Sequence, residues 1–229
     1  MADLSVEVFK LLRRKFFNKA GIPIPFPLRD KRNTQDDPLD EYICEILANG
    51  FPRETSCIKS PGSLITPDLV VLRPDKCKDS SPDKLKSDLE NIIAVEVKKL
   101  QRSKSGKIAR ESGLDYNTTP PCGTIRIYDS KDNPLDIRCF YLFICFELDS
   151  GRKKSYKITA LTLCDGNVLN QDFQYYLSIT GKRTKQIGLG TYKNGLDRQR
   201  PMMVFANPLG AEDIDHNVTL IHPNKDLHK

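Results

Sequence analysis

The chain has 229 residues, enough for one sizeable core, and its 38% hydrophobic and 29% charged residues fit a globular protein. No apolar stretch reaches the roughly 20 residues that a membrane span needs, and the first residues lack the pattern of a secretory signal. Seven cysteines without CxxC or metal spacing disfavour a disulfide framework or zinc site, and a net charge of +6 is too mild to indicate nucleic-acid binding alone. We therefore expect an intracellular, cytoplasmic protein without a membrane partner.

An amphipathic helix is predicted at residues 4–17, where apolar residues are interleaved with lysine and arginine. Asp3 or Ser5 is the expected N-cap, and Gly21 follows the end of the helix. The basic face of this helix is interpreted as a solvated surface.

A second helix is predicted at residues 38–48, with Asp37 as N-cap and Pro38 at the first helical position. Glu45 lies on the flank of its apolar stripe, from which a side chain can reach a cleft beside a sheet. A solvated surface acid is the alternative interpretation of Glu45.

Short runs of aliphatic and β-branched residues, bounded by turn residues, predict a series of strands. They lie at residues 56–60, 68–72, 92–98, 124–128, 138–147 and 156–163. The polar stretch 74–90 between two of them is interpreted as a surface insertion. This succession predicts a single α/β domain with a mixed central β-sheet flanked by helices.

Charged residues stand at the ends of two of the predicted strands. Asp68 opens one of them, and Glu96 and Lys98 close the next, where strand alternation places them on one face. Charges at the end of a buried strand need partners, since burying an unpaired charge is costly. Two carboxylates that converge from adjacent strands make an oxygen site suited to Mg²⁺, and a lysine beside them can hold an attacking water.

This Pro-Asp…Glu-x-Lys pattern resembles the PD-(D/E)XK nuclease superfamily, and its layout is most similar to a type II restriction endonuclease. The resemblance implies one endonuclease domain over residues 1–229, with a restriction-endonuclease-like core at about 38–165. The remaining part, about 166–229, is expected to serve DNA recognition or dimerisation.

The resemblance also implies roles for individual residues. Asp68, Glu96 and Lys98 would be catalytic, and the metal would be held by Asp68, Glu96 and the backbone carbonyl of Val97, with Glu45 as a further candidate. The expected cofactor is Mg²⁺, for which Mn²⁺ can substitute. The alternative is a Pro-Asp turn opening one strand and a Glu–Lys ion pair on the exposed face of another.

The function implied is Mg²⁺-dependent hydrolysis of double-stranded DNA at a specific short sequence by a prokaryotic restriction–modification enzyme. A homodimer is expected, because two active sites related by a two-fold axis can cut both strands of a palindrome. The first helix and the irregular C-terminal third are the free surfaces that could pair. The alternatives are a structure-specific or repair nuclease of the same superfamily and a non-catalytic DNA-binding protein.

Two basic stretches, residues 98–110 and 182–200, contain almost no acids and are the candidate DNA-contacting segments. Polar and basic side chains in these stretches, and in the segment that follows the first of them, can bond to phosphates or base edges. The candidates are Gln101, Arg102, Lys104, Lys107, Arg110, Asn117, Thr118, Lys182, Arg183 and Lys185.

Overall fold

The computed structural model describes ten segments of the chain. They are residues 3–33, 37–51, 55–61, 66–73, 89–102, 121–128, 132–149, 154–171, 174 and 218–227, without the side chains of residues 100–102 and 225. None of the helices in these segments is long and apolar enough to cross a membrane.

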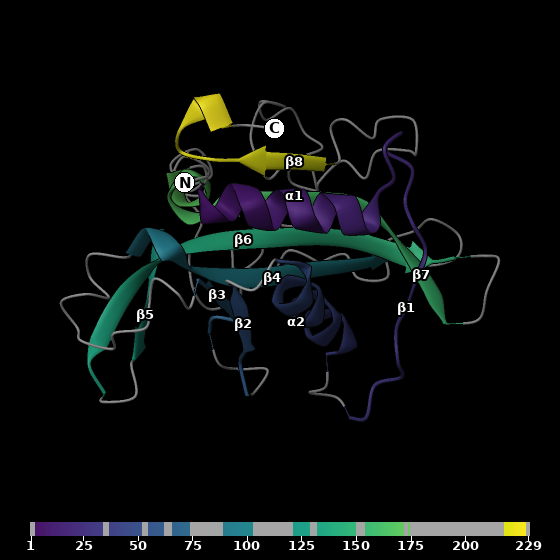
Figure 1. Cartoon of the computed structure of the whole chain (residues 1–229), viewed down its shortest axis with the longest axis horizontal. Helices are drawn as coiled ribbons and strands as arrows, with labels where there is room; N and C mark the ends of the chain where they lie inside the picture. Colours follow the sequence, from purple (N-terminus) through teal and green to yellow (C-terminus); the bar gives the residue numbers. More distant parts are fainter. Residues whose placement is uncertain are drawn as a thin grey trace.

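Within these segments, eight strands form one mixed sheet (Figure 1). The strands are β1 (Phe26–Pro27), β2 (Ser56–Lys59), β3 (Leu69–Leu72), β4 (Ile92–Arg102), β5 (Thr124–Tyr128), β6 (Pro134–Leu148), β7 (Ser155–Asp165) and β8 (Val218–Ile221). The order is β1-β7-β6-β4-β3-β2, with β5 paired to β6 and β8 paired to β7. The pairs β4–β6 and β7–β8 are parallel, and the other pairs are antiparallel.

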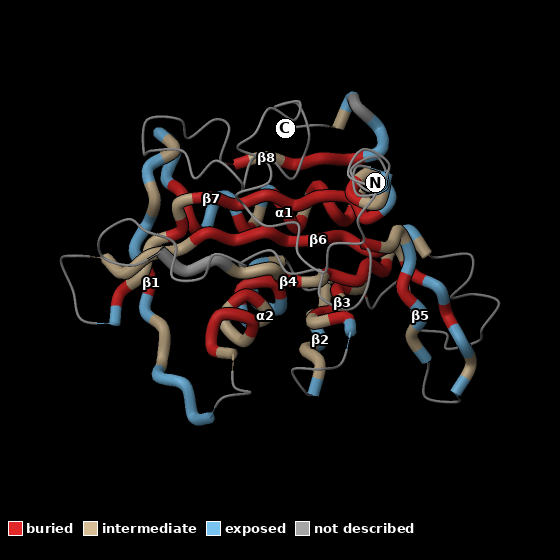
Figure 2. The backbone as a smooth tube through the Cα atoms, turned by 180° about the vertical axis from the view of Figure 1, so that it is seen from behind, coloured by how far each residue is buried: buried red, intermediate tan, exposed pale blue. Residues whose placement is uncertain are grey.

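The helices α1 (Leu4–Phe16) and α2 (Pro38–Gly50) pack on one face of the sheet (Figure 1). Their apolar residues share a core with Ile93, Val95 and Val97 of β4. The opposite face carries a second buried cluster, which includes Ala94 of β4, Ile125 of β5 and Leu169 of a helical turn at residues 166–171. Both faces of the central strands are therefore covered, and Figure 2 shows β6 and β7 buried along most of their length.

The predicted mixed α/β architecture with flanking helices is confirmed, and so are both helix starts. Asp3 is the N-cap of α1, and Asp37 caps α2 by accepting hydrogen bonds from the N–H groups of Leu39 and Asp40. The sequence did not predict β1, β8 or the helical turn at 166–171. Two 3₁₀ turns, η2 (Leu89–Asn91) and η3 (Lys225–Leu227), complete the described elements.

The apolar face of α1 is buried in the core, so only the polar face of this helix is available for the dimer predicted from the sequence. Its large side chains, including Phe9, Leu12 and Phe16, are fully buried against the sheet and α2. Burying a side chain of this size contributes about 1.5–3 kcal/mol. A dimer formed through this face would have to break these contacts first, and they supply most of the free energy that holds α1 on the sheet. Only the polar face of α1 remains exposed.

A partly buried ion pair between Asp3 and Arg138 fixes the beginning of α1 to the sheet. The Asp3 carboxylate accepts hydrogen bonds from the Ser5 N–H at 2.8 Å and from the Arg138 guanidinium at 2.9 Å. Burial opposes ionisation of Asp3, but the hydrogen bonds from Arg138 and Ser5 outweigh it and lower its pKa from 3.8 to about 2. The ionised form of Asp3 thus stabilises the fold.

Replacement of Asp3 tests this attachment. Asp3→Ala removes the cap and the ion pair, so urea unfolding at pH 7 should show a loss of about 2 kcal/mol. Asp3→Asn keeps the capping oxygen and should lose about half as much. Because the folded pKa lies below the unfolded value, the charge-dependent part is present above about pH 4 and disappears as the pH falls toward 2. The loss of stability in Asp3→Asn, relative to the wild type, should therefore be smaller at pH 3 than at pH 7. If Asp3→Ala were as stable as the wild type at pH 7, this role of Asp3 would be contradicted.

Candidate functional site

Asp68 lies at the point where strand β3 begins and its pairing with β4 stops. The last paired residues are Leu69 and Val95, so in this antiparallel register Asp68 comes opposite Glu96. The Val97 N–H, one residue further along β4, donates a hydrogen bond of 2.7 Å to Oδ2 of Asp68. The carboxylate thus replaces the missing strand as the hydrogen-bond partner of the β4 backbone.

Glu96 and Lys98 lie on the same face of β4, as strand alternation predicts. The Lys98 ammonium donates to Oε1 of Glu96 at 2.7 Å, and the two side chains are 24% and 13% exposed. The other carboxylate oxygen, Oε2 of Glu96, is buried and has no hydrogen-bond partner within the described residues. A buried, unsatisfied carboxylate oxygen is costly, and it is a free ligand position.

The electrostatic environment of Asp68 disfavours its ionised form. Burial and then the negative charge of Glu96 raise the pKa of Asp68 from 3.8 to about 6, with a smaller contribution from Asp40. The Val97 N–H and the charge of Lys99 act in the opposite direction but do not outweigh these effects. Two carboxylates that repel each other in a partly buried site would be stabilised by a shared cation.

A second cluster, missed in the sequence, attaches α2 to the other face of β4. The Lys99 ammonium donates to Asp40 at 2.6 Å and also to Asp37, which caps α2. Burial opposes protonation of Lys99, but these two carboxylates outweigh it and raise its pKa. The available signal was the same as for Glu96, namely a charge within an apolar strand that requires a partner.

The acid on α2 that acts on the site is Asp40. Glu45, the candidate from the sequence, is exposed, whereas the charge of Asp40 raises the pKa of Asp68. One oxygen of Asp40, Oδ1, is buried without a hydrogen-bond partner among the described residues. Asp40 thus acts on the pKa of Asp68 from the helix side of the sheet, while Asp68 and Glu96 form the candidate carboxylate pair.

A divalent cation fits this arrangement chemically. The Val97 carbonyl lies on the same side of β4 as its N–H, because both groups of a strand residue point to one neighbour, so it is directed toward Asp68. Two carboxylates with one carbonyl suffice for Mg²⁺, which keeps several of its waters. The described residues contain no ready-made group of three acidic, cysteine or histidine ligands. The fit rests on the unsatisfied Glu96 oxygen and the raised pKa of Asp68.

Most of the predicted DNA contacts fall outside the described parts of the chain. Gln101 and Arg102 belong to β4, with side chains that are not described. Lys104, Lys107, Arg110, Asn117, Thr118, Lys182, Arg183 and Lys185 lie outside the described residues.

Comparison with protein-family models, curated proteins and solved structures found no match for this chain. Inference about function therefore rests on the geometry around Asp68, Glu96 and Lys98.

The raised pKa of Asp68 predicts an unusual effect of its amide variant. An acid with a raised folded pKa stabilises the fold below its unfolded value of 3.8, and this stability is lost as the pH rises through about 6. Asp68→Asn keeps an oxygen for the Val97 N–H without the charge. In metal-free urea unfolding at pH 7.5 it should be more stable than the wild type by about 1–3 kcal/mol.

This advantage of Asp68→Asn should vanish below about pH 4, where the wild-type carboxyl is protonated in both states. Asp226→Asn, at an exposed position, is the control and should show no such pH dependence. A less stable Asp68→Asn protein at pH 7.5 would contradict the electrostatic account of the site.

Proposed function

We propose that this protein is a metal-dependent endonuclease that hydrolyses phosphodiester bonds of double-stranded DNA at a specific short sequence, as type II restriction endonucleases do. The observation that carries the proposal is the meeting of Asp68 and Glu96 on adjacent strands, with the Lys98 ammonium 2.7 Å from Glu96. A partly buried carboxylate pair with one unsatisfied oxygen and an adjacent lysine is suited to phosphodiester hydrolysis.

Asp68, Glu96 and the Val97 carbonyl would hold Mg²⁺, with Mn²⁺ as a substitute. The chemistry supplied by such an ion is a lower pKa for a bound water and neutralisation of charge on a phosphate oxygen. The residues of the chain prepare the site for this. The Val97 N–H fixes the Asp68 carboxylate, and the backbone of β4, paired to β6 along its length, fixes Glu96.

Lys98 would position the attacking water. One of its three N–H donors is used by Glu96, and no other partner of its ammonium occurs among the described residues. The remaining donors can bond to a water or to a phosphate oxygen and offset the negative charge that develops during attack. The bond to Glu96 keeps the flexible lysine stem beside the carboxylates.

The arrangement of the elements supports a restriction-endonuclease-like core. Helix α2 precedes an antiparallel β2-β3-β4 unit that carries the acids on its second and third strands, and β6 adds in parallel. Sequence recognition is assigned to the segment that follows β4 and to the C-terminal part of the chain. Cleavage of both strands of a palindrome would require two copies, so we propose a homodimer on DNA, formed through surfaces other than the apolar face of α1.

Digestion of plasmid DNA with Mg²⁺ tests the proposal. A sequence-specific enzyme should give discrete fragments, and Asp68→Asn and Glu96→Gln should each reduce the rate by at least about a hundredfold. Glu147→Gln is the matched control, because Glu147 forms a similar ion pair with Lys157 (3.1 Å) on β6 and β7, and it should cut normally. Nicking limited to branched DNA would instead indicate a structure-specific nuclease, and intact DNA under all conditions would contradict the proposal.

Lys98→Ala should separate catalysis from binding. Loss of the ammonium beside the carboxylates affects the chemical step, so cleavage should fall by about a hundredfold or more while duplex binding with Ca²⁺ changes little. Lys157→Ala removes the lysine of the control ion pair and should affect neither quantity. Equal losses of binding and cleavage in Lys98→Ala would mean that Lys98 only anchors a phosphate.

A further inference from the structure

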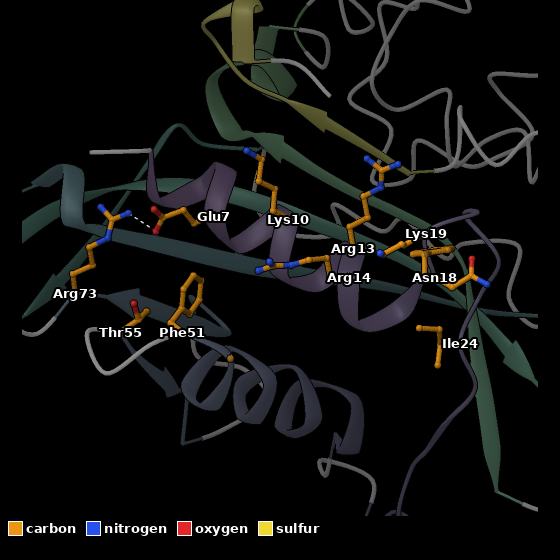
Figure 3. Close-up of a pocket in the computed structure, with 12 residues that line it drawn as sticks. Glu7, Lys10, Arg13, Arg14, Asn18, Lys19, Ile24, Phe51, Thr55 and Arg73 are labelled. Carbon is orange, nitrogen blue, oxygen red and sulfur yellow. Dashed lines mark hydrogen bonds and ion pairs between the residues drawn. The ribbon is translucent and has the colours of Figure 1, made fainter.

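A groove of about 1010 Å³ runs along the polar face of α1, on the helix side of the sheet (Figure 3). Its walls come from α1, from the residues after α2, and from the ends of β2 and β3. None of Asp68, Glu96 and Lys98 lines it. It is therefore distinct from the candidate metal site.

The groove is strongly cationic. Its described lining includes Lys10, Arg13, Arg14, Lys19 and Arg73, against the single acid Glu7. Glu7 is itself paired with Arg73 (Figure 3), whose Nη2 donates to Oε2 of Glu7 at 2.5 Å. The other four cations are exposed and form no ion pair within the described residues. An uncompensated positive surface of this kind attracts a polyanion.

The spacing of the cations favours a chain of phosphates over a single one. Lys10 lies three positions before Arg13 and four before Arg14 on α1, so its Cβ atom is about 5–6 Å from that of each, whereas the adjacent Arg13 and Arg14 diverge around the helix and widen the positive surface. Lys19 continues the row beyond the helix end, and Arg73 lies at the other end (Figure 3). A site for one phosphate group would need these cations to converge on a single point.

The floor of the groove is partly apolar and aromatic. Phe51, just after α2, points toward α1 in Figure 3, and Ile24 is 38% exposed at the far end. Positive grooves with an aromatic floor bind nucleic-acid strands through phosphates and base or sugar faces. An anionic membrane fits less well, because the apolar face that α1 would need to insert is buried in the core.

We infer that this groove, through the exposed cations Lys10, Arg13, Arg14 and Lys19, binds the phosphate backbone of a nucleic acid. It is a second contact surface, separate from the carboxylate site. The inference does not rest on the proposed hydrolysis, because it depends only on the charge, spacing and shape of the groove.

Two adjacent positions of α1 provide a matched test. Arg14 lines the groove, whereas Lys15 is also an exposed cation of the same helix but is absent from the described lining. Arg14→Glu and Lys15→Glu change the net charge equally, so a difference between them reports the groove itself. Binding of fluorescent oligonucleotides is measured by anisotropy in EDTA, which excludes cleavage.

Arg14→Glu should weaken binding about tenfold and reduce the slope of log affinity against log salt by about 1. Lys10→Glu combined with Arg14→Glu should reduce the slope by about 2, while Lys15→Glu should leave it nearly unchanged. Parallel titrations with a duplex and with a single strand identify which form of backbone the groove takes. Circular dichroism of each variant checks that the helix is intact.

Equal effects of Arg14→Glu and Lys15→Glu would overturn the inference, because attraction would then depend on overall charge. Binding to phosphatidylserine vesicles without binding to oligonucleotides would also overturn it. Groove-dependent binding by a protein that never cleaves DNA would leave the inference standing and refute the nuclease proposal. If Arg14→Glu changed neither the affinity for DNA nor its cleavage, the groove inference would be overturned and the nuclease proposal would stand.

Discussion

The hydrogen bond from the Val97 N–H to the Asp68 carboxylate connects the architecture of the sheet to its candidate chemistry. Where β3 begins, β4 loses a neighbouring strand on one side, and a side chain takes the place of the missing backbone acceptor. The same bond holds Asp68 beside Glu96, in a partly buried position where its ionised form is disfavoured. An asparagine could fill the structural role without this electrostatic cost. The presence of a carboxylate is therefore better explained by a cation that relieves the repulsion than by the backbone bond alone.

Two consecutive lysines of β4 illustrate how strand alternation divides structural from chemical roles. Lys99 points to the helix side and joins Asp37 and Asp40, so it docks the first turn of α2 on the sheet. Lys98 points to the opposite side and bonds only to Glu96 among the described residues. A buried ion cluster such as that of Lys99 specifies how a helix sits on a sheet more than it adds stability. The docking of α2 in turn brings the charge of Asp40 close enough to act on Asp68.

Local signals in the sequence were sufficient for the features that depend on neighbouring residues. The N-caps Asp3 and Asp37 and the shared face of Glu96 and Lys98 follow from capping preferences and from the two-residue period of a strand. That Asp40 and not Glu45 is the acid of α2 that acts on the site depends on how α2 is rotated against the sheet, which the sequence of the helix does not determine.

Features that depend on distant parts of the chain were not predictable in the same way. The strands β1 and β8 have two and four residues, too few for a clear alternation, and both pair with β7 across long separations. The cationic groove joins α1 to Arg73 at the end of β3. From the sequence, the basic residues of α1 were interpreted as an ordinary solvated face, because the groove forms only when the helix packs beside the ends of β2 and β3.

The central claim is that Asp68 and Glu96 share one divalent cation. Anomalous diffraction from crystals grown with Mn²⁺ tests it most directly, because the ion is located independently of any activity. The account predicts one strong peak within about 2.0–2.4 Å of a carboxylate oxygen of each residue and close to the Val97 carbonyl. The absence of a peak at saturating Mn²⁺, or a peak elsewhere with Lys98 still bonded to Glu96 and Oε2 of Glu96 still unoccupied, would contradict it.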